Sequence, residues 1–147
     1  MSEEIKKGLL GIVVDETTIS HVVPELSALT YRGYKVQDLC DKCDFEEVAY
    51  LVLHGELPSK AQLKKFVKEE RSNRKLSKTI IKNIQQMPKN AHPMDVIRTC
   101  VSLMALEDKD TKDNSPKANM RKALKIFSQT PTAVAAVSYT HLTLPTI

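Results

Sequence analysis

Residues 44–59 read DFEEVAYLVLHGELPS, and this stretch carries the signals for both ends of one helix. Asp44 can accept from the first backbone N–H groups while Glu47, three residues on, reaches back, which is the capping-box pattern. Gly55 supplies the left-handed residue that commonly follows the end of a helix. Residues 48–53 are apolar on nearly every side, which predicts that this helix is buried.

The same reasoning predicts four further helices downstream. Ser59 and Gln62 repeat the capping arrangement, Pro93 suits the first position of a helix, and Ser115 precedes another proline in that position. Pro88 and Pro131 are expected to end helical runs. The expected inward faces are Leu63, Phe66 and Val67; Leu76, Ile80, Ile81, Ile84 and Met87; Ile97, Cys100, Val101 and Met104; and Met120, Ala123, Leu124 and Phe127.

The start of the chain has a different pattern. Residues 9–14 form a short apolar run, residues 17–19 and 27–31 tolerate strand geometry, and Gly33 separates the last of these from a helical pattern that begins at Val36. Residues 108–114 are charged and polar, as in a loop. We therefore expect a mainly α fold with a short antiparallel β element at the start.

Composition places the chain among globular proteins. Its 147 residues are 41% hydrophobic and 27% charged, too mixed for a disordered chain. No stretch approaches the roughly 18–20 apolar residues that a spanning helix needs, and residues 1–7 are too charged for a signal-peptide core. The three cysteines, an odd number, suit a reducing compartment. These features predict a cytoplasmic protein with no membrane partner.

Few residues indicate chemistry by themselves. Cys40 and Cys43 form a C-x-x-C, typical of a redox pair or half a zinc site, but no paired ligands complete a four-ligand site, so packing is favoured and no metal is expected. His92 at a helix start and His54 at a helix end suit capping and the helix dipole better than catalysis. The sequence has no phosphate-binding, dinucleotide-binding or nucleophile-elbow motif.

Residues 60–89 are strongly basic, with eight lysines and two arginines against two glutamates. One hypothesis is a small helical module that binds nucleic acid. Against it stand the 5% aromatic content and the absence of tryptophan, since stacking platforms for bases are aromatic. Solvated outer faces of helices explain the charge better, so no nucleic-acid partner is expected.

Three blocks, in this order and at this spacing, resemble the opening of citrate synthase-type enzymes. They read LTYRGYKVQDL at residues 29–39, FEEVAYLVLHGELPS at 45–59 and HPMDVIRT at 92–99. KGLLGIVVDETTIS at 7–20 and ERSNRKLS at 70–77 are most similar to the 2-methylcitrate synthase branch. The resemblance runs from about residue 7 to residue 136 and implies the N-terminal portion of the family's large helical domain, in incomplete form.

The resemblance also implies a reaction. Enzymes of this family are acyltransferases that condense oxaloacetate with an acyl-CoA, propionyl for 2-methylcitrate and acetyl for citrate, and then hydrolyse the thioester. They require no metal or prosthetic group, and the acyl-CoA counts as a substrate rather than a cofactor. They work as homodimers. A citrate synthase proper of the tricarboxylic acid cycle is the alternative within the family.

The family's catalytic His and Asp motifs match nothing in this chain, so no catalytic residue is assigned and the chain is expected to be inactive as it stands. One substrate-binding residue is implied by the resemblance: Arg71, in the ERSNR stretch, matches a position that contacts substrate in similar proteins. A guanidinium can bind a carboxylate or a phosphate with two parallel hydrogen bonds, although an exposed helical arginine would look the same.

The last residues change in character. Residues 137–146 read VSYTHLTLPT, which resembles the translation of a transposase-type sequencing adaptor joined in frame. We therefore expect residues 1–136 to be native and residues 137–147 to be foreign, and we leave Tyr139, His141 and Leu144 out of functional reasoning. The alternative is a genuine β-like segment, because Tyr, Thr, Val and Leu tolerate strands.

Overall fold

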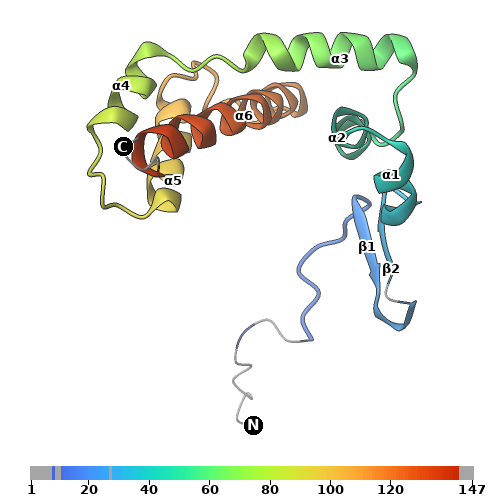
Figure 1. The fold of residues 1–147 in the computed structure, drawn as a ribbon. Helices are drawn as coiled ribbons and strands as arrows, with labels where there is room; N and C mark the ends of the chain where they lie inside the picture. The colour runs from blue at the N-terminus through green and yellow to red at the C-terminus, as the bar shows by residue number, and fades with distance from the viewer. Residues whose placement is uncertain (1–7, 9–10, 27, 143–147) are drawn as a thin grey trace. The chain divides into compact units, whose positions relative to one another are not determined.

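The computed structural model describes residue 8, residues 11–26 and residues 28–142, which form two compact units, Met1–Leu63 and Lys64–Ile147 (Figure 1). The elements are β1 (Ser20–Val23), a 3-10 turn (Pro24–Leu26), β2 (Ala28–Tyr31), β3 (Tyr34–Lys35), α1 (Val36–Lys42), α2 (Phe45–His54), α3 (Lys60–Asn73), α4 (Lys78–Gln86), α5 (Pro93–Leu106), α6 (Pro116–Val137) and a π-helical turn (Ser138–Leu142). The mainly α prediction, with an antiparallel β element at the start, is confirmed.

The β element is a three-stranded antiparallel sheet in the order β1-β2-β3. Tyr31 pairs with Tyr34, so Arg32 and Gly33 alone make the turn between β2 and β3. Both have positive φ, 50° and 88°. This is the pattern of a type I′ turn, whose twist matches that of the strands it joins. The first strand begins at Ser20, so the prediction of strand geometry at residues 17–19 is wrong. Of the apolar run at residues 9–14, only residues 11–14 are described, and they form no strand.

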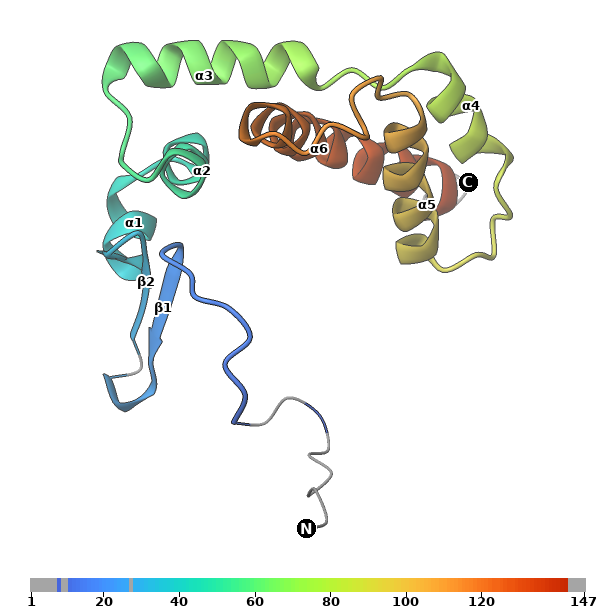
Figure 2. The ribbon, with the colours of Figure 1, turned by 180° about the vertical axis from the view of Figure 1, so that it is seen from behind.

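Arg32 adopts a backbone conformation that disfavours a side chain, and its guanidinium makes compensating bonds. Nε and Nη2 donate to the carbonyl oxygen of Val52 at 3.3 and 2.9 Å, and Nη1 donates to Thr18 Oγ1 at 2.6 Å. Because Val52 lies in the last turn of α2, where carbonyls lack helical donors, Arg32 fixes the hairpin turn to the end of that helix. Figure 2 shows β1 and β2 beside α1, with α2 next to it.

Helix α2 begins and ends where the sequence predicts. Glu47 Oε2 accepts from the backbone N–H of Asp44 at 2.8 Å, and Gly55 has a φ of 95°. Its predicted burial is confirmed only for Leu51, because the remaining residues of 48–53 are half-buried and Phe45 is 69% exposed. Within the part of the chain that the structure describes, α2 therefore has too few neighbours to cover its apolar surface.

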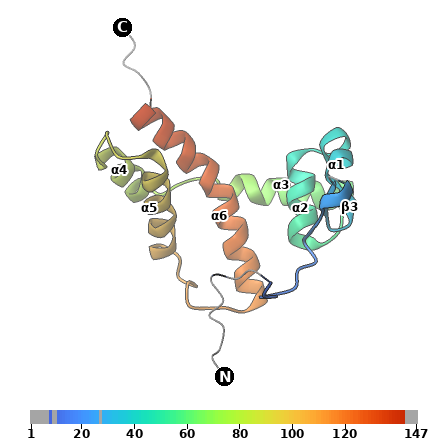
Figure 3. The same cartoon turned by 90° about the horizontal axis from the view of Figure 1, so that it is seen from below.

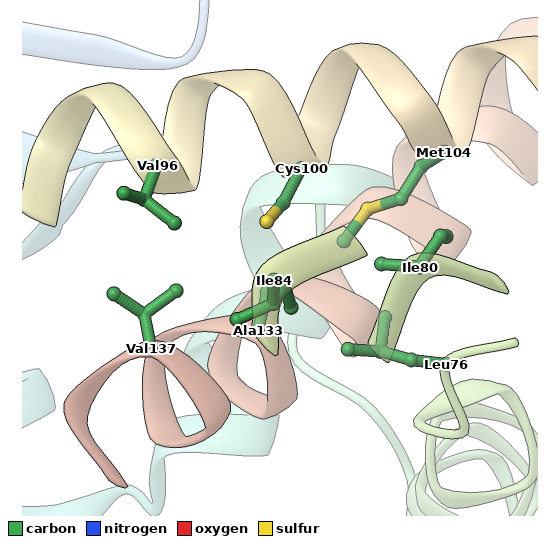
Figure 4. Close-up of a cluster of buried hydrophobic side chains, with 8 residues drawn as sticks. All are labelled: Leu76, Ile80, Ile84, Val96, Cys100, Met104, Ala133 and Val137. Carbon is green, nitrogen blue, oxygen red and sulfur yellow. The ribbon is translucent and has the colours of Figure 1, made fainter. Parts of the chain in front are cut away.

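The core of the second unit lies between α4, α5 and α6, which all contact one another (Figure 3). Side chains from the three helices and from Leu76, two residues before α4, point toward a common centre in Figure 4. Ser115 begins its helix as expected, and its Oγ accepts from a backbone N–H of α6; Ser77, which was not predicted as a cap, does the same for α4. The buried cluster comprises Leu76, Ile80, Ile84, Val96, Cys100, Met104, Ala133 and Val137.

Two of the predicted inward-facing residues point outward instead. Ile81 is 39% exposed and Met120 is 37% exposed. Ile80 and Ile84 occupy the inner face of α4, and Ile81 is rotated about 100° from Ile80 on the same helix, so it cannot share that face. Val96, which the sequence analysis did not select, is buried because it lies four residues before Cys100 on α5.

The prediction that Pro131 ends a helix is wrong, because α6 continues through it to Val137. Proline removes one ladder hydrogen bond and costs about 3 kcal/mol in a helix interior. Ala133 and Val137, both beyond the proline, are buried in the core, and this burial offsets the penalty.

The described end of the chain is helical. Residues 138–142 form a π-helical turn, and His141 Nε2 lies 3.2 Å from the carbonyl oxygen of Ile84. The β-like alternative for the tail is therefore wrong for these residues, and Leu144 lies outside the described residues. No helix among the described residues is both long enough and apolar enough to cross a membrane.

The core predicts a sharp contrast between two isoleucines of α4. Ile84→Ala deletes a side chain with no exposure, which should lower the free energy of unfolding of the second unit by about 2–5 kcal/mol. Ile81→Ala, the matched control on the exposed face, should change it by less than about 1 kcal/mol. The measurement is the urea concentration that halves the helical circular dichroism; equal shifts in the two variants would contradict the packing.

Exposed apolar side chains predict low solubility or incomplete folding of the isolated chain. Leu106 is 83% exposed, and Phe45, Met94, Ile126 and Val134 are also exposed, more than a soluble monomer usually presents together. The 147-residue chain should be poorly soluble or only partly folded. Size-exclusion chromatography and thermal melting check this: a monomer with one sharp cooperative melt would contradict it.

Candidate functional site

Arg71, the predicted substrate-binding residue, lies in the last turn of α3 and is exposed. The start of this helix is fixed by Ser59 and Gln62, as predicted: Gln62 Oε1 accepts from the Ser59 backbone N–H at 2.8 Å and from Ser59 Oγ at 2.7 Å. The opposite side of α3 carries buried Phe66. Its ring centroid lies 6.4 Å from that of Phe127 on α6, in a tilted arrangement within the second unit.

Arg71 belongs to a row of exposed cations. Lys60, Lys64, Lys68 and Arg71 are exposed and follow one another at intervals of four, four and three residues, which places them on one face of the helix. Among the described residues, no hydrogen bond or ion pair of the Arg71 side chain is found. The guanidinium is thus available to an anion such as a carboxylate or a phosphate.

The neighbouring arginine of the same stretch has a different role. Arg74 Nε donates to both carboxylate oxygens of Glu70, at 2.8 and 3.0 Å. Glu70 is buried, and a buried carboxylate needs such a partner to offset the loss of water. The sequence ERSNR therefore contains one arginine, Arg74, that is paired with a buried carboxylate, and a second, Arg71, that is exposed.

A charged cluster that the sequence analysis did not identify lies in the loop between α5 and α6. Asp108 accepts from Arg121 at 3.2 Å and from Lys125 at 3.2 Å, and Arg121 also contacts Asp110 at 2.8 Å. The hydrogen bond from Arg121, followed by that from the backbone N–H of Asp110, holds the pKa of Asp108 well below its usual range. A carboxylate so firmly ionised is a poor general base and serves to fix the loop.

Beside this cluster α5 and α6 form a small, largely apolar groove of about 110 Å³. Gln129 is one of its lining residues and is buried; its Nε2 donates to the carbonyl oxygen of Lys75 at 3.0 Å. The groove contains no cysteine, serine or histidine, and its carboxylate, Asp108, is already paired. The residues lining it are Val101, Met104, Ala105, Asp108, Thr111, Lys122, Lys125, Ile126 and Gln129.

The C-x-x-C lies at the end of α1. Cys40 is exposed and Cys43, the residue that follows the helix, is half-buried. Burial, followed by the charges of Glu47 and Asp44, raises the pKa of the Cys43 thiol, which disfavours the thiolate form that binds metals. No group of three or more metal-binding side chains occurs in residues 8, 11–26 and 28–142.

The histidines have structural positions. His92 precedes α5 and its Nδ1 accepts from the backbone N–H of Met94 at 3.2 Å, which confirms the predicted cap. His54 ends α2, and its ring stacks on Tyr50 with centroids 4.2 Å apart. The His92 ring is thus occupied as a helix cap, and the His54 ring is packed against its own helix.

Comparison with known proteins agrees with the fold. Residues 8–145 match the family model described as the citrate synthase C-terminal domain. The crystal structure of citrate synthase from Thermoplasma acidophilum superposes with a TM-score of 0.88, at 24% identity, over 99% of this chain and 38% of that one.

Two curated relatives have a higher sequence identity to this chain than that structure has. The 2-methylcitrate synthase of Mycobacterium tuberculosis is 48% identical over 132 residues, which is 90% of this chain and 33% of that protein. The citrate synthase of Mycolicibacterium smegmatis is 49% identical over 131 residues, 89% of this chain and 35% of that protein. The chain spans about a third of the length of these curated relatives. The match over residues 8–145 shows that this chain belongs to the citrate synthase family.

Proposed function

We propose that this chain is the early part of the large domain of an enzyme that condenses oxaloacetate with an acyl-CoA and hydrolyses the resulting thioester, in the 2-methylcitrate synthase branch. The observation that carries the proposal is the 48% identity to a 2-methylcitrate synthase along 90% of the chain. Sequence identity of this extent includes surface positions as well as the core.

The reaction sets requirements that the described residues do not meet by themselves. Removing a proton next to a thioester carbonyl needs a positioned base and a hydrogen-bond donor for the developing enolate. In the described residues, Asp108 is tied to Arg121 and Lys125, and His92 is used as a helix cap. We therefore assign proton transfer to the two-thirds of the relatives' length that this chain does not cover, and infer that the chain alone is inactive.

Substrate charge gives Arg71 its role in the proposal. Oxaloacetate carries two carboxylates and an acyl-CoA carries phosphates, and both are suited to a guanidinium with two parallel donors. The structural neighbour from Thermoplasma acidophilum is a complex with carboxymethyl coenzyme A and oxaloacetate. Both arginines of this stretch are exposed, but Arg74 is bound to Glu70.

The choice of acyl group rests on similarity to the two branches. The citrate synthase of Mycolicibacterium smegmatis matches this chain as well as the 2-methylcitrate synthase of Mycobacterium tuberculosis does. The segments at residues 7–20 and 70–77 favour the second, and we infer propionyl-CoA as the preferred substrate, with a citrate synthase proper as the alternative.

We further propose that the complete enzyme is a cytoplasmic homodimer. The exposed apolar side chains of α5 and α6, including Leu106, Met94 and Val134, need partners. The remainder of the enzyme and a second copy would supply them. The chain's cysteines are free thiols, which suits a reducing compartment.

Residues 137–147 remain a proposed foreign tail, and residues 1–136 the native part. The family match extends to residue 145 and the described part of the tail packs through Val137. Reading the source DNA across the junction after Ala136 tests the proposal: an uninterrupted native reading frame through Ile147 would contradict it.

The acyl preference predicts a kinetic result for the complete enzyme, restored from its source DNA. Its kcat/KM for propionyl-CoA should exceed that for acetyl-CoA, both measured by release of free coenzyme A in the presence of oxaloacetate. The 147-residue chain, assayed alongside, should release none. A clear preference for acetyl-CoA would reverse the branch assignment, and turnover by the short chain would contradict the placement of the catalytic groups.

Arg71→Ala in the complete enzyme should lower kcat/KM at least tenfold, since a hydrogen-bonded charge pair contributes about 1.5–3 kcal/mol. Lys65→Ala, on the same helix but outside the row that contains Arg71, is the control and should change it by less than about twofold. Arg71→Lys should restore only part of the activity, because an ammonium cannot make the paired contact. If Arg71→Ala and Lys65→Ala behave alike, Arg71 does not contact substrate.

A further inference from the structure

We propose that Cys40 and Cys43 are a peroxide-responsive dithiol that closes reversibly to a disulfide at the end of α1. The pair has no part in the condensation reaction proposed above, so it is a separate site. Both cysteines lie in the first unit.

The backbone keeps the two cysteines close together at the end of α1. The N–H of Cys43 donates to the carbonyl oxygen of Leu39 at 3.0 Å, so the chain is helical up to that residue. Residues three apart on a helix have Cα atoms about 5 Å from each other, within the roughly 4.4–6.8 Å range of disulfides. Their Cβ atoms, about 5–6 Å apart, must approach by one or two ångströms. Cys43 has extended φ and ψ values, −123° and 145°, and lies outside the helix, where such an adjustment meets least resistance.

Exposure separates this pair from the third cysteine. Cys40 is exposed and Cys43 is half-buried, whereas Cys100 is buried in the core between α4, α5 and α6. A dissolved oxidant therefore reaches Cys40 first, and a neighbouring thiol is in place to react with the product.

The chemistry balances with one molecule of hydrogen peroxide. The Cys40 thiolate attacks one peroxide oxygen, the O–O bond breaks, and the sulfur becomes a sulfenic acid with release of water. The Cys43 sulfur then attacks the sulfenic sulfur and releases the second water. The two thiols lose two hydrogens in total, and peroxide is reduced to two waters.

Local charge sets the rate of the second step. Glu47 and Asp44 face Cys43 from the start of α2, and Lys42 opposes them from α1. The Cys43 thiolate is therefore disfavoured, which slows its attack on the Cys40 sulfenic acid. Because Cys43 immediately precedes Asp44, the first residue of the α2 capping box, the disulfide would stiffen the junction between α1 and α2.

The test uses the complete enzyme, restored from its source DNA and treated with hydrogen peroxide, followed by alkylation of free thiols, proteolysis and mass spectrometry. The expected product is a loss of about 2 Da confined to the peptide that contains Cys40 and Cys43, reversed by dithiothreitol. Cys100→Ser should behave like the parent chain, whereas Cys40→Ser and Cys43→Ser should show no loss. Glu47→Gln, which keeps a capping side chain, should speed closure several-fold at the same pH.

Three outcomes would overturn the proposal. One is alkylation of both cysteines after peroxide treatment; another is accumulation of sulfinic acid without the 2 Da loss. The third is equal closure rates in the parent and Glu47→Gln chains together with equal rates in urea, which would show that the folded junction plays no part.

Discussion

The packing of α4 against α5 and α6 is the constraint on which the second unit depends. Ile80 and Ile84 occupy the inner face of α4 with almost no exposure, and Cys100 and Val137 face them from the other two helices. Burying a side chain of this size contributes about 1.5–3 kcal/mol. This is enough to keep α6 helical through a proline and to bring residues from the far end of the chain beside α4.

The same core explains where the charged residues stand. With one face of α3 held by the Phe66–Phe127 contact, the opposite face, including Arg71, is left to solvent. The loop between α5 and α6 is fixed by Asp108 and its two cations rather than by apolar packing. The molecule thus separates the groups that maintain the fold, such as Glu70 and Asp108, from the one arginine proposed to meet a substrate.

Local rules were enough to predict most helix ends. The caps at Asp44, His92 and Ser115 depend on neighbouring residues alone, so they can be predicted from the sequence. The Asp108–Arg121 pair could not be predicted, since it joins residues 13 apart across a loop whose path is set by packing. The prediction that Pro131 ends a helix was wrong for a similar reason. The free-energy cost of a proline inside a helix is offset by the burial of side chains in the three-helix core, which the sequence alone does not show. Ile81 and Met120 were wrongly predicted to face inward, because the apolar positions on each helix span a wider arc than the face that is buried. The candidate site is even harder to predict from the sequence. Arg71 and Arg74 have the same chemistry, and only the structure shows that Glu70 binds Arg74.

We propose that residues 8–136 form the front portion of an oxaloacetate–acyl-CoA condensing enzyme. The most direct measurement replaces the matching segment of the 2-methylcitrate synthase of Mycobacterium tuberculosis with these residues and follows the release of coenzyme A from propionyl-CoA and oxaloacetate. Our account predicts a folded chimaera that retains oxaloacetate-dependent turnover. A chimaera that folds and melts like its parent but releases no coenzyme A would contradict it.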